Sequence, residues 1–362
     1  MQELAKGTAA GGTLRRLAVR IVASRAVAEM LGRVPAAGGV ILRYHSVNDD
    51  PAWSGDYVQP SLVVAPDVFD RQVSFLASNH RIVGMDELVA GLRGGKRLDG
   101  RAVAITFDDG YEDNHRFALP ILRKHGATAT FYVTTGAVED EKVLWTVELR
   151  NAVRRSRERG LALSSLSGRA IDISTPDAKE SAIKLLTGMV KRVGAREAHA
   201  MLEEILAATG VPRGRPEQRV MMSWDELRTM HRSGMTIGAH TVTHLNLPCL
   251  ETADVVREVR ESKEALERAL DAPVVHFAYP NGRTGRNFDA RVAHVVADAG
   301  LISAVSCVNG PASRRYPRYA IPRLGVRETD HDPARLACAI QRARFTRPRH
   351  PDLEDVRRRG PS

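Results

Sequence analysis

The sequence predicts an α/β protein in which parallel strands alternate with helices. Short, continuous apolar runs of the kind that form strands buried on both faces recur along the chain. Amphipathic segments with helical spacing fall between these runs. The chain has 362 residues, of which 43% are hydrophobic, so it can build a large core. Its composition has no collagen-like, disordered or disulfide-scaffold bias.

Six apolar runs are expected to form strands. They are GVILRY (39–44), AVAITF (102–107), ATATFYV (127–133), MTIGA (235–239), VVHFAY (274–279) and ISAVSC (302–307). Two helices are expected between them. Residues 66–78 begin with Pro66, which suits a first helical turn, and residues 251–270 carry an apolar stripe with charges elsewhere.

The chain divides into a main domain and two flanking segments. Residues 38–343 hold all the expected strands and form the domain. Within it, about 145–217 is charged and helical without a convincing strand, which predicts a helical insertion. Residues 1–37 are expected to be a basic helix or leader. Residues 344–362 are rich in Arg and Pro and are expected to be a disordered basic tail.

The net charge of +10 favours an anionic partner, such as a glycan, phosphate groups or a membrane surface, or it reflects an Arg-rich surface. No nucleic-acid partner is expected, because RNP, zinc-finger and helix-turn-helix motifs are not found. Residues 14–31 place four arginines among apolar residues. This segment could lie on an anionic membrane or pack on the domain. Its apolar runs are too short to span a bilayer.

Cysteine usage and the N-terminal sequence bear on location. The three cysteines have no metal-ligand spacing and are odd in number, which favours a reducing compartment. The N-terminal sequence does not read as a signal peptide. We therefore expect a cytoplasmic protein, with the inner face of the membrane as the other possibility.

Two adjacent acids follow the strand at 102–107. Because side chains alternate along a strand, Asp108 and Asp109 should point in different directions and can hold different roles. One carboxylate could bind a metal while the other serves as a general base, and Gly110 would allow a sharp turn. Alternatively the acids belong to a polar loop that caps a helix. A phosphotransferase of the haloacid dehalogenase type is disfavoured, because that family usually has an Asp-x-Asp motif and binds magnesium through oxygen ligands.

Two histidines follow the strand at 235–239. His240 and His244 have the i, i+4 spacing that puts two side chains on one side of a helical turn, which suits two ligands of one metal. Each could instead be a hydrogen-bonded core residue. Carboxyl ends of parallel strands share one edge, so this pair should lie near the two acids. Three protein ligands leave an open metal position, as in catalytic sites.

TFDDG followed downstream by HTVTH resembles the polysaccharide deacetylase family, which shares the NodB homology domain. The resemblance covers roughly residues 38–330. It includes ILRYHSV, FDRQVSFLASNHRIVGMDEL, ITFDDGYEDN, ALPILRKHGATATFYVTTG, MSWDELRTM, IGAHTVTHLNL and FAYPNGR. It implies an irregular (β/α) barrel that hydrolyses N-acetyl groups on a glycan or glycan precursor and releases acetate, using a metal-bound water.

The resemblance also implies roles for single residues. Asp108 matches the general base, and Asp109, His240 and His244 match the metal ligands. Zinc is the expected metal, with cobalt and nickel open, because ligand type alone does not decide among them.

A groove-lining motif is matched by Tyr279, Pro280 and Asn281, and the N–H of Asn281 would stabilise the oxyanion. The substrate could be a poly-N-acetylglucosamine, a chitin-like oligomer, peptidoglycan, a lipid-linked sugar or a non-sugar amide. Trp145 could stack on a sugar ring or anchor packing.

Two departures from the family pattern stand out. The groove motif usually carries an Arg that contacts the catalytic aspartate, and Ala278 stands there. Arg323 could replace it, or form an ordinary surface ion pair. The late Leu-x-His motif, which supplies the general acid, is not visible. His45 is our candidate for that acid, with a structural role as the alternative; His276 should point into the core, and His331 lies late in a loop. These departures keep a non-catalytic glycan-binding or scaffolding member open, although the retained base argues against it.

Overall fold

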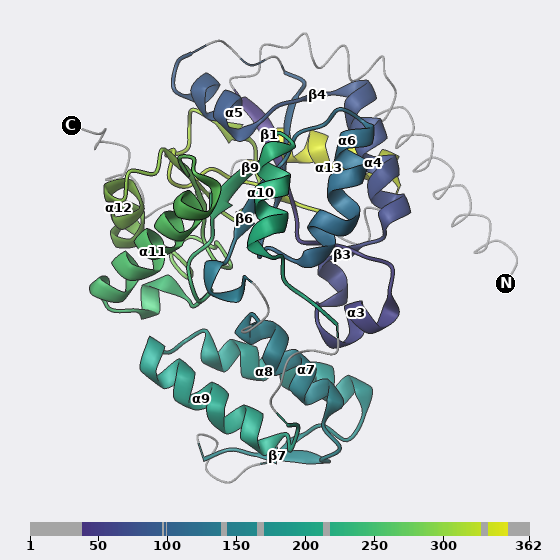
Figure 1. The fold of residues 1–362 in the computed structure, drawn as a ribbon, viewed down its shortest axis with the longest axis vertical. Helices are drawn as coiled ribbons and strands as arrows, with labels where there is room; N and C mark the ends of the chain where they lie inside the picture. The colour runs from purple at the N-terminus through teal and green to yellow at the C-terminus, as the bar shows by residue number, and fades with distance from the viewer. Residues whose placement is uncertain are drawn as a thin grey trace, which may run out of the picture.

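The computed structural model describes residues 38–95, 98, 100–138, 143–164, 170–212, 218–326 and 332–346. The expected leader (1–37), the tail beyond 346 and His331 lie outside the described residues. Figure 1 shows an α/β body with a helical lobe beneath it. Within the described ranges, none of the helices combines the length and apolar character needed to cross a membrane.

The body is built on one sheet whose strand order is β11-β10-β9-β6-β5-β1-β12, with β13 beside β1 and β4 beside β5. The strands are β1 (Gly38–Tyr44), β4 (Arg81–Ile82), β5 (Ala102–Phe107), β6 (Thr130–Val133), β9 (Thr236–Ala239), β10 (His276–Ala278), β11 (Ser303–Val305), β12 (Ala312–Ser313) and β13 (Leu324–Gly325). Pairs in this sheet are parallel apart from β1–β12. A further pair, β2 (Ser46–Val47) and β3 (Val63–Val64), is also parallel.

The sheet curls towards closure through one late segment. Ile321 forms a parallel bridge with Val305 of β11, and three residues later β13 begins to pair with β1. The segment thus spans the gap between the two ends of the sheet. This confirms the irregular (β/α) barrel. The six expected strands are all present: β5 has the expected bounds, β1 is one residue longer, and the other four are one to three residues shorter.

The two faces of the strands pack into separate cores. Inward-facing side chains, among them Ile41, Ala104 and Tyr132, form the inner core. Gly238 must be small, because a Cβ there would lie 2.5 Å from the ring of Tyr132. Alternate side chains form the outer core against the helices. Burial of both faces explains why the strands are continuous apolar runs.

Helices cover the outer face of the sheet (Figure 1). They are α4 (Pro66–Asn79), α6 (Leu119–Lys124), α10 (Trp224–Arg232), α11 (Thr252–Leu270), α12 (Ala290–Asp298) and α13 (Pro333–Phe345). The helix α5 (Met85–Leu92) instead packs its buried side chains into the inner core, and α3 (Pro51–Asp56) contacts α7 (Trp145–Arg155) of the lobe. Short 3-10 segments occur at Pro60–Leu62, Thr135–Ala137 and Leu247–Cys249, and a π-helical turn at Asn114–Ala118. As expected, Pro66 starts α4. The helix α13 runs two residues beyond the boundary expected at 343.

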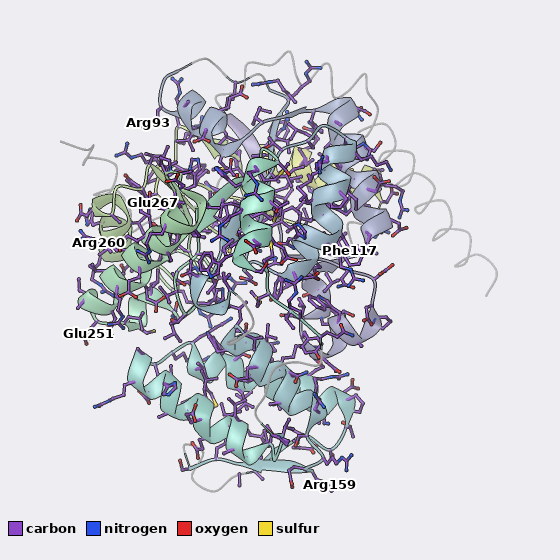
Figure 2. All side chains as sticks on the ribbon, viewed as in Figure 1. Arg93, Phe117, Arg159, Glu251, Arg260 and Glu267 are labelled. Carbon is purple, nitrogen blue, oxygen red and sulfur yellow. The ribbon has the colours of Figure 1, made fainter. Side chains whose placement is uncertain are left out.

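The insertion lobe comprises residues 145–164 and 170–212. It contains α7 (Trp145–Arg155), α8 (Pro176–Val190) and α9 (Ala195–Ala208), which enclose a core of their own. It also contains an antiparallel pair, β7 (Gly160–Ala162) with β8 (Ala170–Asp172), where no strand was expected. Three-residue strands are too short to show a period of two. Figure 2 shows Arg159 at the far end of this lobe and Arg93 at the opposite end of the molecule.

Candidate metal and catalytic site

Asp109, His240 and His244 come together at the carboxyl ends of β5 and β9. Their candidate ligand atoms all lie within 4.8 Å of one another, and all three residues are buried. The Nε2 atoms of His240 and His244 lie 3.4 and 3.3 Å from Oδ1 of Asp109. One carboxylate oxygen and two imidazole nitrogens facing a common point fit a zinc-like cation.

Asp108 and Asp109 diverge because the chain turns sharply between strand and loop. Asp109 has φ 78° and Gly110 has φ 92°, so two successive residues adopt the left-handed conformation. Asp tolerates this region better than most residues. The expected separation of the two carboxylates is therefore present, although a left-handed turn produces it rather than strand alternation alone.

The histidine loop (residues 240–244) is not the helical turn that the i, i+4 spacing suggested. Thr241 and His244 have φ of 68° and 60°, and no helix is assigned here. The hydroxyl of Thr241 accepts a hydrogen bond from His244 N at 3.0 Å. Side chains that bond to the loop backbone replace helical hydrogen bonds, and the two imidazoles still face one carboxylate.

Glu258 of α11 fixes the conformation of this loop through hydrogen bonds. Its buried carboxylate accepts hydrogen bonds from Val242 N and Thr243 N, both at 2.9 Å, and from Thr243 Oγ1 at 2.6 Å. Glu258 was not among the expected site residues, although the sequence contains a signal for it. It is an acid on the buried stripe of α11, next to Val259.

Glu258→Gln is expected to weaken zinc binding by about 10–100-fold, because loosening groups that orient metal ligands has effects of this size. A competition titration against a chelating indicator would measure the affinity. Glu261→Gln, at an exposed position of the same helix, is the matched control. Equal zinc affinity in both variants would contradict the positioning role of Glu258.

The protonation states suit metal binding. The Nδ1 atom of His240 donates to the carbonyl of Ala278 at 2.7 Å, which leaves Nε2 free to bind a cation. Burial, opposed by Asp109, lowers the pKa of His244, so its imidazole is neutral near pH 7. Burial would raise the pKa of Asp109, but the two imidazoles beside it hold this pKa well below its ordinary value. The groups Asp109 and His244 are therefore in the form that binds a metal, and Nε2 of His240 is directed to the same point.

Asp108 is held by Arg323 rather than by the metal group. The guanidinium donates to both carboxylate oxygens, at 2.6 and 2.7 Å, and both side chains are buried. Burial would raise the pKa of Asp108, but Arg323 and His240 outweigh it and keep this pKa at about 2. Arg323 also donates to Thr106 Oγ1 at 3.2 Å and to the carbonyl of Ser306 at 2.9 Å. The alternative of a surface ion pair is thus wrong.

His45 directly follows β1, and the charges of Asp108, Asp109 and Arg323 act on its imidazole. Burial lowers its pKa to about 4; Asp109 opposes this shift and Arg43 adds to it. Its imidazole is therefore neutral near pH 7 and would have to take up a proton before acting as a general acid. His276 is buried as expected, with Nδ1 2.8 Å from Ser303 Oγ and Nε2 3.0 Å from Asp86.

The residues of the groove motif lie partly in the core and partly at the site. Tyr279 is fully buried, stacks on Phe288 at 4.1 Å and donates to the carbonyl of Tyr319 at 2.8 Å. Its side chain thus anchors the loop from the core and does not face a substrate, which corrects its expected groove-lining role. Pro280 is also buried. Asn281 is partly exposed and has φ 60°, so it is the member of the motif that reaches the site.

Two more side chains complete the surroundings. Tyr111, buried two residues after Asp109, donates a hydrogen bond to that carboxylate, and burial together with Asp109 raises the pKa of the phenol well above its usual value. Trp145 is buried in the lobe core and donates to the carbonyl of His244 at 3.3 Å. Of its two expected roles, packing anchor is the one that the structure supports.

Comparison with known proteins agrees with this geometry. A family model described as polysaccharide deacetylase matches residues 95–303. YxkH of Bacillus subtilis (strain 168), provisionally named a polysaccharide deacetylase, is 22% identical over 79% of this chain and 70% of its own length. Poly-beta-1,6-N-acetyl-D-glucosamine N-deacetylase of Escherichia coli (strain K12) is 32% identical over 25% of this chain and 13% of its own length.

A solved structure shares the fold. The deacetylase PplD of Streptococcus pyogenes, in complex with acetate, aligns with a TM-score of 0.57 at 19% identity, covering 83% of this chain and 97% of its own. The family match spans more than half of the chain, over the part that carries the two acids and the histidine loop. The chain therefore belongs to the polysaccharide deacetylase family, whose members hydrolyse N-acetyl groups on carbohydrates.

Proposed function

We propose that this protein is a metal-dependent N-deacetylase of an N-acetylated glycan or glycan precursor and releases acetate. One observation carries the proposal. The buried group of Asp109, His240 and His244 lies beside a second carboxylate, that of Asp108, which Arg323 keeps ionised. A site built only to hold a cation has no use for a separate base beside it.

The bound cation, zinc in first place with cobalt or nickel as alternatives, would acidify a water molecule and polarise the acetamide carbonyl. Asp108, ionised above about pH 2, accepts the proton of the attacking water. Arg323 fixes the direction of both carboxylate oxygens. The backbone N–H of Asn281 stabilises the oxyanion, a contribution typically worth about 10²–10³ in rate.

The substrate that we favour is a polymer or precursor of N-acetylglucosamine. The Escherichia coli relative is named for poly-β-1,6-N-acetyl-D-glucosamine, and the net charge of +10 suits an envelope glycan that also carries anionic groups. A lipid-linked sugar at an anionic membrane surface would suit the same charge.

Removal of the metal is expected to abolish acetate release. Protein treated with a chelator and dialysed should be inactive on N-acetylated oligosaccharides, and one equivalent of zinc, cobalt or nickel should restore the rate, because the ligand set has one carboxylate and two imidazoles. Acetate would be measured by a coupled assay on β-1,6-linked, chitin-type and peptidoglycan fragments. If no metal restored acetate release from any of them, the non-catalytic, glycan-binding reading would replace this one.

A further inference from the structure

Lys191 enters the site from the insertion lobe. It directly follows α8 and its ammonium Nζ lies 2.5 Å from Oδ1 of Asn281, the residue expected to stabilise the oxyanion. The ammonium also lies 5.9 Å from the centre of the Trp145 ring. The lobe thus brings an ammonium group to Asn281, within electrostatic range of Asp109.

Hydrogen bonds from neighbouring loops hold the backbone of Lys191 in place. Its carbonyl accepts a hydrogen bond from Asn246 Nδ2 at 2.8 Å, and Oδ1 of Asn246 accepts one from Asn287 at 3.0 Å. Trp145 ties the lobe to the histidine loop at His244. These contacts join the lobe to the two loops that carry the ligands and Asn281.

The surroundings of Lys191 favour proton transfer. Burial lowers its pKa, Asp109 and Cys307 act to raise it, and Arg286 acts to lower it further. The same charge also lowers the pKa of His244. Among the described residues, no carboxylate is within ion-pair distance of Nζ. A desolvated ammonium without a counter-ion releases its proton more readily than a surface lysine.

We propose that Lys191 is the general acid that protonates the departing amine, in the site where the late histidine motif is missing. The inference rests on the proposed deacetylation. As the C–N bond of the tetrahedral intermediate breaks, its electron pair stays on nitrogen, which takes a proton from Nζ. The neutral lysine then recovers the proton that Asp108 took from water, so protons balance over one turnover.

Two other charged groups at the reacting centre, Arg323 and Asp108, are committed to other tasks. Arg323 does not release a proton in proteins and has both terminal nitrogens on Asp108. Asp108 must first accept a proton from water. Lys191 has three N–H donors and uses one on Asn281, so two can face a substrate.

The decisive experiment compares two leaving groups on the metal-loaded full chain. Lys191→Met should lower the rate on a β-1,6-linked N-acetylglucosamine pentamer by about 10²–10⁴-fold. It should change metal-dependent hydrolysis of 4-nitrophenyl acetate only a few-fold, because 4-nitrophenolate leaves as a stabilised anion without a proton. Lys191→Arg keeps the charge but not a releasable proton, so it should behave like the Met variant.

The control is Lys184→Met, at an exposed position of the same helix, which should match the wild type on both substrates. Equal loss on both substrates in Lys191→Met, or full rescue by Arg, would overturn the proposal, because either result assigns Lys191 to charge stabilisation or folding. An inactive metal-loaded wild type would instead refute the proposed function, and the inference with it.

A second measurement does not depend on turnover. Acetic anhydride labels lysines only as free amines, so peptide mass spectrometry of the intact protein labelled across a pH series gives a midpoint for each lysine. The midpoint for Lys191 should lie at lower pH than the ordinary lysine value of 10.5. A midpoint at the same or higher pH would overturn the proton-donor role.

Discussion

Asp108→Asn is expected to reduce metal-dependent acetate release by about 10²–10⁴-fold while zinc stays bound. The amide cannot accept the proton of the attacking water, whereas Asp109 and the two histidines still provide the complete ligand set. Acetate release and zinc content, measured on the same preparation, would test both halves of the expectation.

Two comparison variants distinguish loss of the base from loss of a metal ligand. Asp109→Asn should lose zinc as well as activity, because it removes the ligating carboxylate. Asp225→Asn, whose side chain is 91% exposed, should retain both. Near-normal activity in Asp108→Asn would show that another group accepts the proton, and loss of zinc in that variant would place Asp108 among the ligands.

Arg323→Met should lower the free energy of unfolding by about 3–5 kcal/mol, because it leaves the buried Asp108 carboxylate without its partner. Denaturant titration at pH 7 would measure the change. Arg71→Met removes an exposed pair with Asp67 and should cost no more than about 1 kcal/mol. Losses of equal size in the two variants would contradict the buried character of the Asp108–Arg323 pair.

The pH dependence of the same variant has a definite sign. In the wild type the pKa of Asp108 is about 2, below its ordinary 3.8, so the stability from this ionised carboxylate is complete above about pH 4. It is lost as pH falls towards 2. Without Arg323, burial dominates and the pKa of Asp108 rises, so the acid limb of the activity profile should move to higher pH.

Much of the fold and site could be predicted from the sequence, because the strands are buried on both faces. Such strands appear as continuous apolar runs, and their carboxyl ends meet at one edge. The residues directly after β5 and β9 were therefore expected to lie together, and Asp109, His240 and His244 do so.

The parts that could not be predicted depend on long-range contacts or on local backbone geometry. Arg323 meets Asp108 across 215 positions, through the segment that spans the open side of the barrel. The histidine loop uses left-handed residues and the carboxylate of Glu258 instead of helical hydrogen bonds. Lys191 reaches Asn281 only because the lobe docks on the site, a contact that no local pattern encodes.

The measurement that tests the metal centre most directly is an anomalous difference map from crystals of the zinc-loaded protein. We expect one strong peak about 2.0–2.2 Å from a carboxylate oxygen of Asp109 and from Nε2 of His240 and His244. Asp108 should remain on Arg323, outside the ligand shell. A peak at another place, or one ligated by Asp108 with Arg323 displaced, would contradict the assignment of ligands and base.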